Sequence, residues 1–154
     1  MIIREARIDD IAQLHIVRNA VIENQLSDPS RVTVDDYVEY LTVWGKGWLC
    51  EVGKEIVGFA IVDLRENSIW ALFVKPEFEQ KGIGRKLHST MLAWYFTQTQ
   101  SNVWLTTSSN TRAELFYIKS GWSKVGVNRE DEIKFEMTYD SWRRLGNSKP
   151  IRIL

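Results

Sequence analysis

The residues best suited to chemistry gather in the segment QKGIGRK, residues 80–86. It sets Gly82 and Gly84 one residue apart, among the cationic side chains of Lys81, Arg85 and Lys86. An apolar stretch and a proline precede the segment, and a helical spacing of apolar residues follows it. The segment should therefore lie where a strand ends and a helix begins.

The start of a helix suits an anion, because its free N–H groups point outward and the helix dipole is positive there. Glycines let a bulky phosphate approach these groups without meeting a Cβ atom. The segment therefore predicts a pyrophosphate site. A dinucleotide fingerprint would need a glycine where Leu87 stands, and the Walker A pattern is absent, so both of these phosphate motifs are excluded.

The stretch LFVKPEFEQKGIGRKL, residues 72–87, resembles the acyl-CoA-binding segment of the GNAT superfamily of N-acetyltransferases, whose pattern is Q/R-x-x-G-x-G/A. We assign Gln80 to the polar position of this pattern and Gly82 and Gly84 to its glycines. A second stretch, SNTRAELFYIKSGW, resembles another GNAT signature through residues that pair an asparagine with an aromatic pair and a later Gly-aromatic pair: Asn110, Phe116, Tyr117, Gly121 and Trp122.

The resemblance implies roles for particular residues. The strand with Leu72, Phe73 and Val74 would bulge and splay from its neighbour, bind the pantetheine arm of acetyl-CoA through its backbone, and turn one N–H toward the thioester oxygen. The pyrophosphate would lie on the following turn, which comprises Gln80, Lys81, Gly82, Ile83, Gly84 and Arg85. Asn110 would contact the pantetheine arm, although a capping or loop asparagine is the alternative. Tyr117 would be the general acid that protonates the departing thiolate, and packing is its alternative.

The implied activity is the transfer of an acetyl group from acetyl-CoA to a primary amine of a small molecule or peptide, by direct attack in a ternary complex. The alternative is a non-catalytic CoA-binding or sensing module. Some family members carry a glutamate five residues before the asparagine, where this chain has Leu105. The general base therefore stays open between a water chain and several side chains, namely His15, Glu23, Asp63 and Glu132. His88 follows the core-facing Leu87, and we expect it on a solvated face.

In this fold the acceptor usually lies between the loop that joins the first two helices and the last hairpin. Both regions are acidic, which would attract a cationic amine, unless these are ordinary solvated charges. The acidic residues concerned are Glu23, Asp28, Asp35, Asp36, Glu130, Asp131 and Glu132. Three tryptophans could line the cleft, or simply pack in the core: Trp44, Trp48 and Trp70.

Composition narrows the class of protein. Twenty basic residues balance 20 acidic ones, which argues against a nucleic-acid binder driven by bulk charge. Cys50 is the only cysteine, within the apolar WLCEV, so we expect a buried thiol, no disulfide and no metal site. The N-terminus is charged at once and no run approaches the roughly 20 apolar residues of a membrane span. We expect a cytoplasmic protein that pairs into a homodimer through an exposed strand edge.

The chemistry-bearing segments need elements to position them. Alternating and β-branched stretches predict strands at 2–7, 47–52, 55–64, 68–75, 103–107, 122–127 and 132–139. Apolar spacing and caps at Asp9, Thr33 and Thr111 predict helices after each of them, besides the helix at 83–97. The helix after Thr33 has Asp36 in its capping box and should end at Gly45. Gly53-Lys54 should form a turn between strands, and the alternation at 132–136 predicts one buried face, with Ile133 and Phe135, and one exposed face. The expected fold is α+β, with a mixed, mainly antiparallel sheet, helices on both faces and the order βααβββαβαββ. Residues 1–145 should form one domain, with a C-terminal tail at 146–154.

Overall fold

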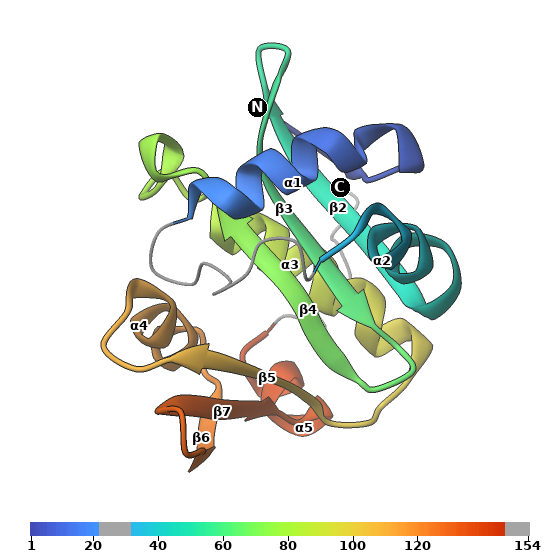
Figure 1. Ribbon diagram of the computed structural model, residues 1–154. Coiled ribbons are helices and arrows are strands. Elements are labelled where there is room, and N and C mark those ends of the chain that lie inside the picture. Colours follow the sequence, from blue (N-terminus) through green and yellow to red (C-terminus); the bar gives the residue numbers. More distant parts are fainter. Residues whose placement is uncertain (22–31, 147–154) are drawn as a thin grey trace. The chain divides into compact units, whose positions relative to one another are not determined.

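The computed structural model describes residues 1–21 and 32–146 (Figure 1). The chain divides into two compact units, Met1–Leu92 and Ala93–Leu154, and each is described by itself below. All strand pairs within the two units are antiparallel, and helices accompany the strands in both units. The fold is α+β and mainly antiparallel, as the sequence predicts.

The first unit is built on a four-stranded antiparallel sheet in the order β1-β2-β3-β4. Its strands are β1 (Ile2–Glu5), β2 (Gly45–Val52), β3 (Glu55–Asp63) and β4 (Ser68–Val74). Its helical segments are η1 (Ile8–Asp10), α1 (Ile11–Ala20), α2 (Val34–Glu39), the π-helical turn η3 (Tyr40–Trp44), η4 (Pro76–Phe78) and the first part of α3 (Ile83–Gln98).

Helices cover both faces of this sheet. In Figure 1, α1 and α2 lie in front of strands β2 to β4, and α3 lies behind them. Leu14 and Val17 of α1 belong to the same apolar cluster as Phe59 and Ile61 of β3, because alternate residues of a strand face the same side. Gly58 faces the opposite side, where a Cβ atom would lie 3.2 Å from the Leu87 side chain of α3. The apolar pattern of α1 is thus explained by burial against β3.

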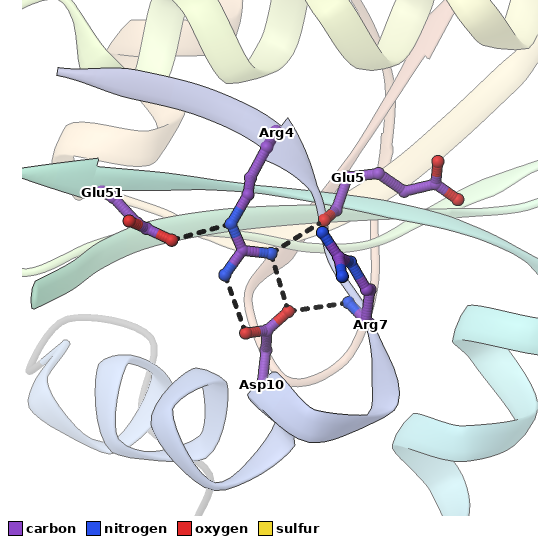
Figure 2. A network of polar contacts seen from close by, with 5 residues as sticks. All are labelled: Arg4, Glu5, Arg7, Asp10 and Glu51. Atoms are coloured by element: carbon purple, nitrogen blue, oxygen red, sulfur yellow. Dashed lines mark hydrogen bonds and ion pairs between the residues drawn. The ribbon is translucent and has the colours of Figure 1, made fainter. Parts of the chain in front are cut away.

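A network of ionic contacts fastens the N-terminal strand (Figure 2). The guanidinium of Arg4 in β1 donates to both carboxylate oxygens of Asp10, at 2.9 and 3.0 Å, and to the carboxylate of Glu51 in β2 at 2.7 Å. Asp10 also accepts a hydrogen bond from the backbone N–H of Arg7. The Arg4 contact lowers the pKa of Asp10. This network joins β1 to its neighbouring strand and to the start of α1.

The second unit contains the last antiparallel strands, in the order β5-β7-β6. These are β5 (Val103–Ser108), β6 (Ser123–Val127) and β7 (Glu132–Met137), with the helices α4 (Arg112–Lys119) and α5 (Tyr139–Arg144). Ile133 and Phe135 of β7 are buried while Lys134 between them is exposed, which confirms the expected wet and dry faces of this strand. The core of the unit therefore lies on one side of β7.

Several local predictions need correction. The second helix does not run on as an α-helix to Gly45, because its last turn is π-helical and Gly45 already begins β2. The short helix α5 was not expected, although Thr138 caps it by accepting the N–H of Ser141 at 3.0 Å and Trp142 is buried. His88 is not on a solvated face, since it is only 6% exposed. The buried thiol of Cys50 is confirmed.

Candidate functional site

The turn before α3 has the backbone that a glycine-rich anion site requires. Gly82 has a φ of 82°, in the left-handed region that disfavours any side chain, and Gln80 has a φ of 62°. A Cβ atom added to Gly82 would meet no atom of the described residues within 4 Å. That space is therefore open to a ligand as far as residues 1–21 and 32–146 are concerned.

The N–H groups at the start of α3 complete this turn. The N–H of Lys86 donates to the carbonyl of Gly82 at 3.1 Å. The preceding N–H groups of Ile83, Gly84 and Arg85 have no carbonyl one helical turn earlier within the helix, so they point out of its end. The side chains of Lys81, Arg85 and Lys86 are exposed around them. Backbone donors, helix dipole and three cations can together bind an anion such as a pyrophosphate.

The assignment of Gln80 to the family pattern is wrong by one residue. If Gly82 and Gly84 are the two glycines of Q/R-x-x-G-x-G/A, its polar first position falls on Glu79. The chain departs from the pattern there, with an acid in place of glutamine or arginine. Gln80 itself is exposed and left-handed. The turn's geometry is therefore supported by the glycines, and a ligand contact from the Gln80 side chain has no support from the pattern.

Strand β4 carries a bulge, as the resemblance implies. Its register with β3 pairs Ile61 with Ala71 but Val62 with Ile69, which leaves Trp70 as an extra residue. A bulge turns successive side chains toward the same face, and Trp70 accordingly packs on the same apolar cluster as Ala71. The splaying of this strand from a neighbour stays a prediction.

The pairing of β3 with β4 also determines the direction in which the backbone groups of Leu72, Phe73 and Val74 point. The N–H of Lys75 donates to the carbonyl of Val57 at 2.8 Å. Hydrogen-bonded pairs alternate along an antiparallel ladder, so Phe73 faces β3 with its N–H and C=O, and Leu72 and Val74 direct theirs away from β3. Leu72 and Val74 are thus the better candidates for backbone contacts to a ligand.

Tyr117 lies on α4 within an aromatic cluster of the second unit. Its ring centroid is 5.4 Å from that of Trp122 and 5.9 Å from that of Phe135, and its side chain is only 6% exposed. Burial raises the pKa of Tyr117, because the low-dielectric surroundings disfavour the phenolate. The phenol therefore remains protonated at neutral pH, which is the state that a proton donor requires.

Asn110 precedes α4 with a φ of 59°. Its backbone N–H donates to the carboxylate of Glu114 at 2.8 Å, while the N–H of Glu114 donates to the hydroxyl of Thr111. Thr111 is the cap that the sequence predicts, and the reciprocal bond of the box is made by Asn110 rather than by Thr111 itself. The side chain of Asn110 takes no part in this cap.

The candidates for a general base are mostly engaged elsewhere. Asp63 is 1% exposed and accepts the N–H groups of Arg65 and Glu66, so its carboxylate holds the turn after β3. Glu132 accepts from the side chain of Asn128 at 3.0 Å. Nδ1 of His15 lies 3.1 Å from the hydroxyl of Tyr37. Glu23 lies outside the described residues, and the base is left open.

Some of the acidic residues that were expected to attract the acceptor amine form hydrogen bonds within local structure instead. Asp36 accepts the N–H of Thr33 at 2.8 Å in the predicted capping box of α2, and Asp131 accepts from the hydroxyl of Ser109. Asp28, like Glu23, lies outside the described residues. Of the three tryptophans, Trp48 is 7% exposed and buried, whereas Trp44 and Trp70 are half-buried.

One residue of functional interest, Arg18, was not identified from the sequence. Arg18 falls on the apolar face of α1 beside Val17, and the structure buries it there at 9% exposure. Its guanidinium lies 4.9 Å from the ring centroid of Trp70 and 5.0 Å from that of Phe73. An arginine at an apolar helical position is the signal that could have identified it.

Two features are absent from the described residues. Within residues 1–21 and 32–146, no group of acidic, histidine or cysteine side chains is arranged to hold a metal ion. In the same two stretches, no helix has both the length and the apolar character of a membrane span.

Comparison with known proteins gives one family match. The model of the family described as "Acetyltransferase (GNAT) family" matches residues 15–122. No curated protein sequence matches the chain.

Solved structures resemble the chain at low sequence identity. PaiA N-acetyltransferase from Thermoplasma acidophilum, in complex with coenzyme A, is 17% identical with a TM-score of 0.76, over 90% of this chain and 98% of that one. The ribosomal-protein-alanine N-acetyltransferase from Brucella melitensis is 17% identical with a TM-score of 0.73, over 90% and 99%. The ribosomal-protein-S18-alanine N-acetyltransferase from Escherichia coli is 12% identical with a TM-score of 0.71, over 90% and 93%. At these identities the likeness concerns the fold.

Proposed function

The chain belongs to the acetyltransferase (GNAT) family, and from this premise we propose that it transfers the acetyl group of acetyl-CoA to a primary amine of a small molecule or peptide. The observation that carries the proposal is the turn at Gly82. Its left-handed backbone, the open space at its Cβ position and the helix start behind it form a site for the pyrophosphate of acetyl-CoA.

Strand β4 supplies the second part of the proposed cofactor site. The backbone groups of Leu72 and Val74 would hydrogen-bond the pantetheine arm, and one N–H would donate to the thioester oxygen. That oxygen becomes an oxyanion when the amine attacks, and one such donor contributes about 3 kcal/mol to the transition state. In the second unit, Asn110 would contact the arm through its side-chain amide.

The chemistry then follows a single displacement. The amine lone pair attacks the thioester carbon in a ternary complex, the amine gives up a proton to water or to a base, and the C–S bond breaks. Tyr117 donates its phenolic proton to the CoA thiolate and recovers one from solvent. Burial of Tyr117 is compatible with this role, because it raises the pKa and so keeps the phenol in its protonated form at neutral pH.

The experiment is incubation of the protein with acetyl-CoA and a pooled library of primary amines while free thiol is followed. Calorimetry with acetyl-CoA is run in parallel. Amine-dependent thiol release, with acetylated amine found by mass spectrometry, supports the proposal. Tight acetyl-CoA binding without amine-dependent release would instead identify a CoA-binding or sensing module, an outcome that the buried Leu105 keeps in view.

A homodimer is part of the proposal. All five residues of β6 are exposed, and this strand is the last in the order β5-β7-β6. An exposed edge strand favours pairing with a second copy. Solution scattering at tens of micromolar protein should give a dimer mass, and a monomer mass would exclude it.

A further inference from the structure

Arg18 is a buried cation whose charge is not balanced by a carboxylate of the described residues. Its side chain is 9% exposed, and neither Nε nor Nη1 has a hydrogen-bond partner among residues 1–21 and 32–146. Arg4, which has a structural role, differs from Arg18 in this respect. Its guanidinium donates three hydrogen bonds to the carboxylates of Asp10 and Glu51 (Figure 2). A buried arginine with two nitrogens unsatisfied costs stability, so its retention needs another reason.

The surroundings of Arg18 are aromatic. Among the described residues, the ionisable groups that influence the pKa of Arg18 are the phenols of Tyr37 and Tyr40. Trp70 and Phe73 lie against the guanidinium, and both rings are half-buried. Burial lowers the pKa of Arg18. Aromatic rings therefore surround the guanidinium, and its Nε and Nη1 groups are available to donate hydrogen bonds to an anion.

The position of Arg18 relates it to the proposed thioester site. Phe73, whose ring centroid lies 5.0 Å from the guanidinium carbon, stands between Leu72 and Val74. Those two residues are the ones whose backbone groups point away from β3 and are proposed to bind the pantetheine arm. An anion bound to Arg18 would therefore lie near strand β4. The thioester is proposed to lie along this strand, and the amine must attack it there.

We propose that Arg18 binds a carboxylate of the acceptor, so that the substrate is an amino acid or a similar compound with its amine a few bonds from a carboxylate. The inference rests on the proposed acetyl transfer. A planar guanidinium matches a carboxylate, and aromatic walls suit the short apolar body of an amino acid. In this proposal Arg18 selects the acceptor through its carboxylate, in place of a selection of its amine by the acidic loop residues.

The first experiment compares two probes that differ only in charge: a pool of the proteinogenic L-amino acids and a pool of their carboxamides. Binding is measured by saturation-transfer NMR with CoA present, and transfer by thiol release and mass spectrometry with acetyl-CoA. The wild-type protein should prefer the acids over the amides by about tenfold or more, because hydrogen bonds to a charged group are lost with the amide.

Two variants test whether Arg18 causes this preference. Arg18→Met should abolish the preference for acids. Its Tm without ligand should rise, since a buried, unbalanced cation is replaced by an apolar chain of similar length. Arg65→Met is the matched control, because Arg65 lies 3.8 Å from the ring centroid of Trp44 but is paired with Asp63 at 3.6 Å. It should keep the acid preference.

The outcomes separate the two proposals. Acids that bind in an Arg18-dependent way without thiol release would support the anion site and contradict acetyl transfer. Amides that are acetylated as well as acids, or an unchanged preference in Arg18→Met, would overturn the anion site and leave acetyl transfer standing. A lower Tm of Arg18→Met would mean that the chain itself balances the cation, and this too would overturn the inference. If neither the acids nor the amides bind, the inference is overturned as well.

Discussion

The carboxylate of Glu114 accepts a hydrogen bond of 2.8 Å from the backbone N–H of Asn110, and Asn110 has a φ of 59°. The hydroxyl of Thr111 meanwhile caps α4. The backbone of Asn110 thus belongs to the start of the helix, while its side chain is not used by the cap. These two roles of Asn110 can be separated by substitution.

Asn110→Gly should keep the fold and weaken acetyl-CoA binding. Glycine accepts the left-handed backbone, so the free energy of unfolding should change by less than about 1 kcal/mol. Loss of a side-chain amide contact should lower acetyl-CoA affinity about three- to tenfold, measured by calorimetry. Asn67→Gly, at a φ of 56° in the β3–β4 turn, is the matched control and should bind normally. Normal affinity in Asn110→Gly would make this asparagine a turn residue only.

Gly82→Val should reduce acetyl-CoA affinity at least about tenfold, since its side chain would occupy the open space assigned to the pyrophosphate. Valine at this positive φ also costs about 1–3 kcal/mol of stability. Gly53→Val controls for that cost, because Gly53 has a φ of 65° and equally open surroundings in the β2–β3 turn. Calorimetry on both folded variants decides the question: equal affinities would refute the phosphate-binding turn.

His88 should make the protein sensitive to mild acid. Burial lowers its pKa from 6.5 to about 4, so the unfolded chain binds a proton that the folded chain does not between those values. The contribution is complete above pH 6.5 and is lost as the pH falls toward 4, amounting to about 3 kcal/mol. Urea unfolding across this range should show a shallower decline in His88→Gln than in wild type. Parallel declines would mean that His88 is protonated in the folded state.

Much of the architecture was predictable because it depends on local signals. The cap at Thr33 with Asp36, the turn at Gly53 and the alternation of Ile133, Lys134 and Phe135 each require only neighbouring residues. The exposure of His88 was wrong, because helical spacing places it beside the core-facing Leu87 without showing how wide the buried face is. Tertiary contact decides that width.

The site was predictable to a different extent. Gly82 indicates the turn, because few other residues tolerate its left-handed backbone. The surroundings of Arg18 could not be predicted, because they depend on a bulge that turns Trp70 toward α1 and on pairing between β3 and β4. The side of β4 to which each backbone group points is likewise a matter of register.

Substitution of Tyr117 tests most directly whether the protein is an enzyme that uses this phenol. The measurement is thiol release from acetyl-CoA in single turnovers with an acceptor amine, comparing Tyr117→Phe with Tyr95→Phe. The control removes a hydroxyl that donates to the carbonyls of Ser101 and Asn102 at 3.1 and 3.3 Å, so it should lose about 1 kcal/mol of stability and keep its rate. Tyr117→Phe should keep acetyl-CoA affinity and stability while the chemical step slows about 100-fold. A wild-type rate in Tyr117→Phe would contradict the account and move the proton source to water.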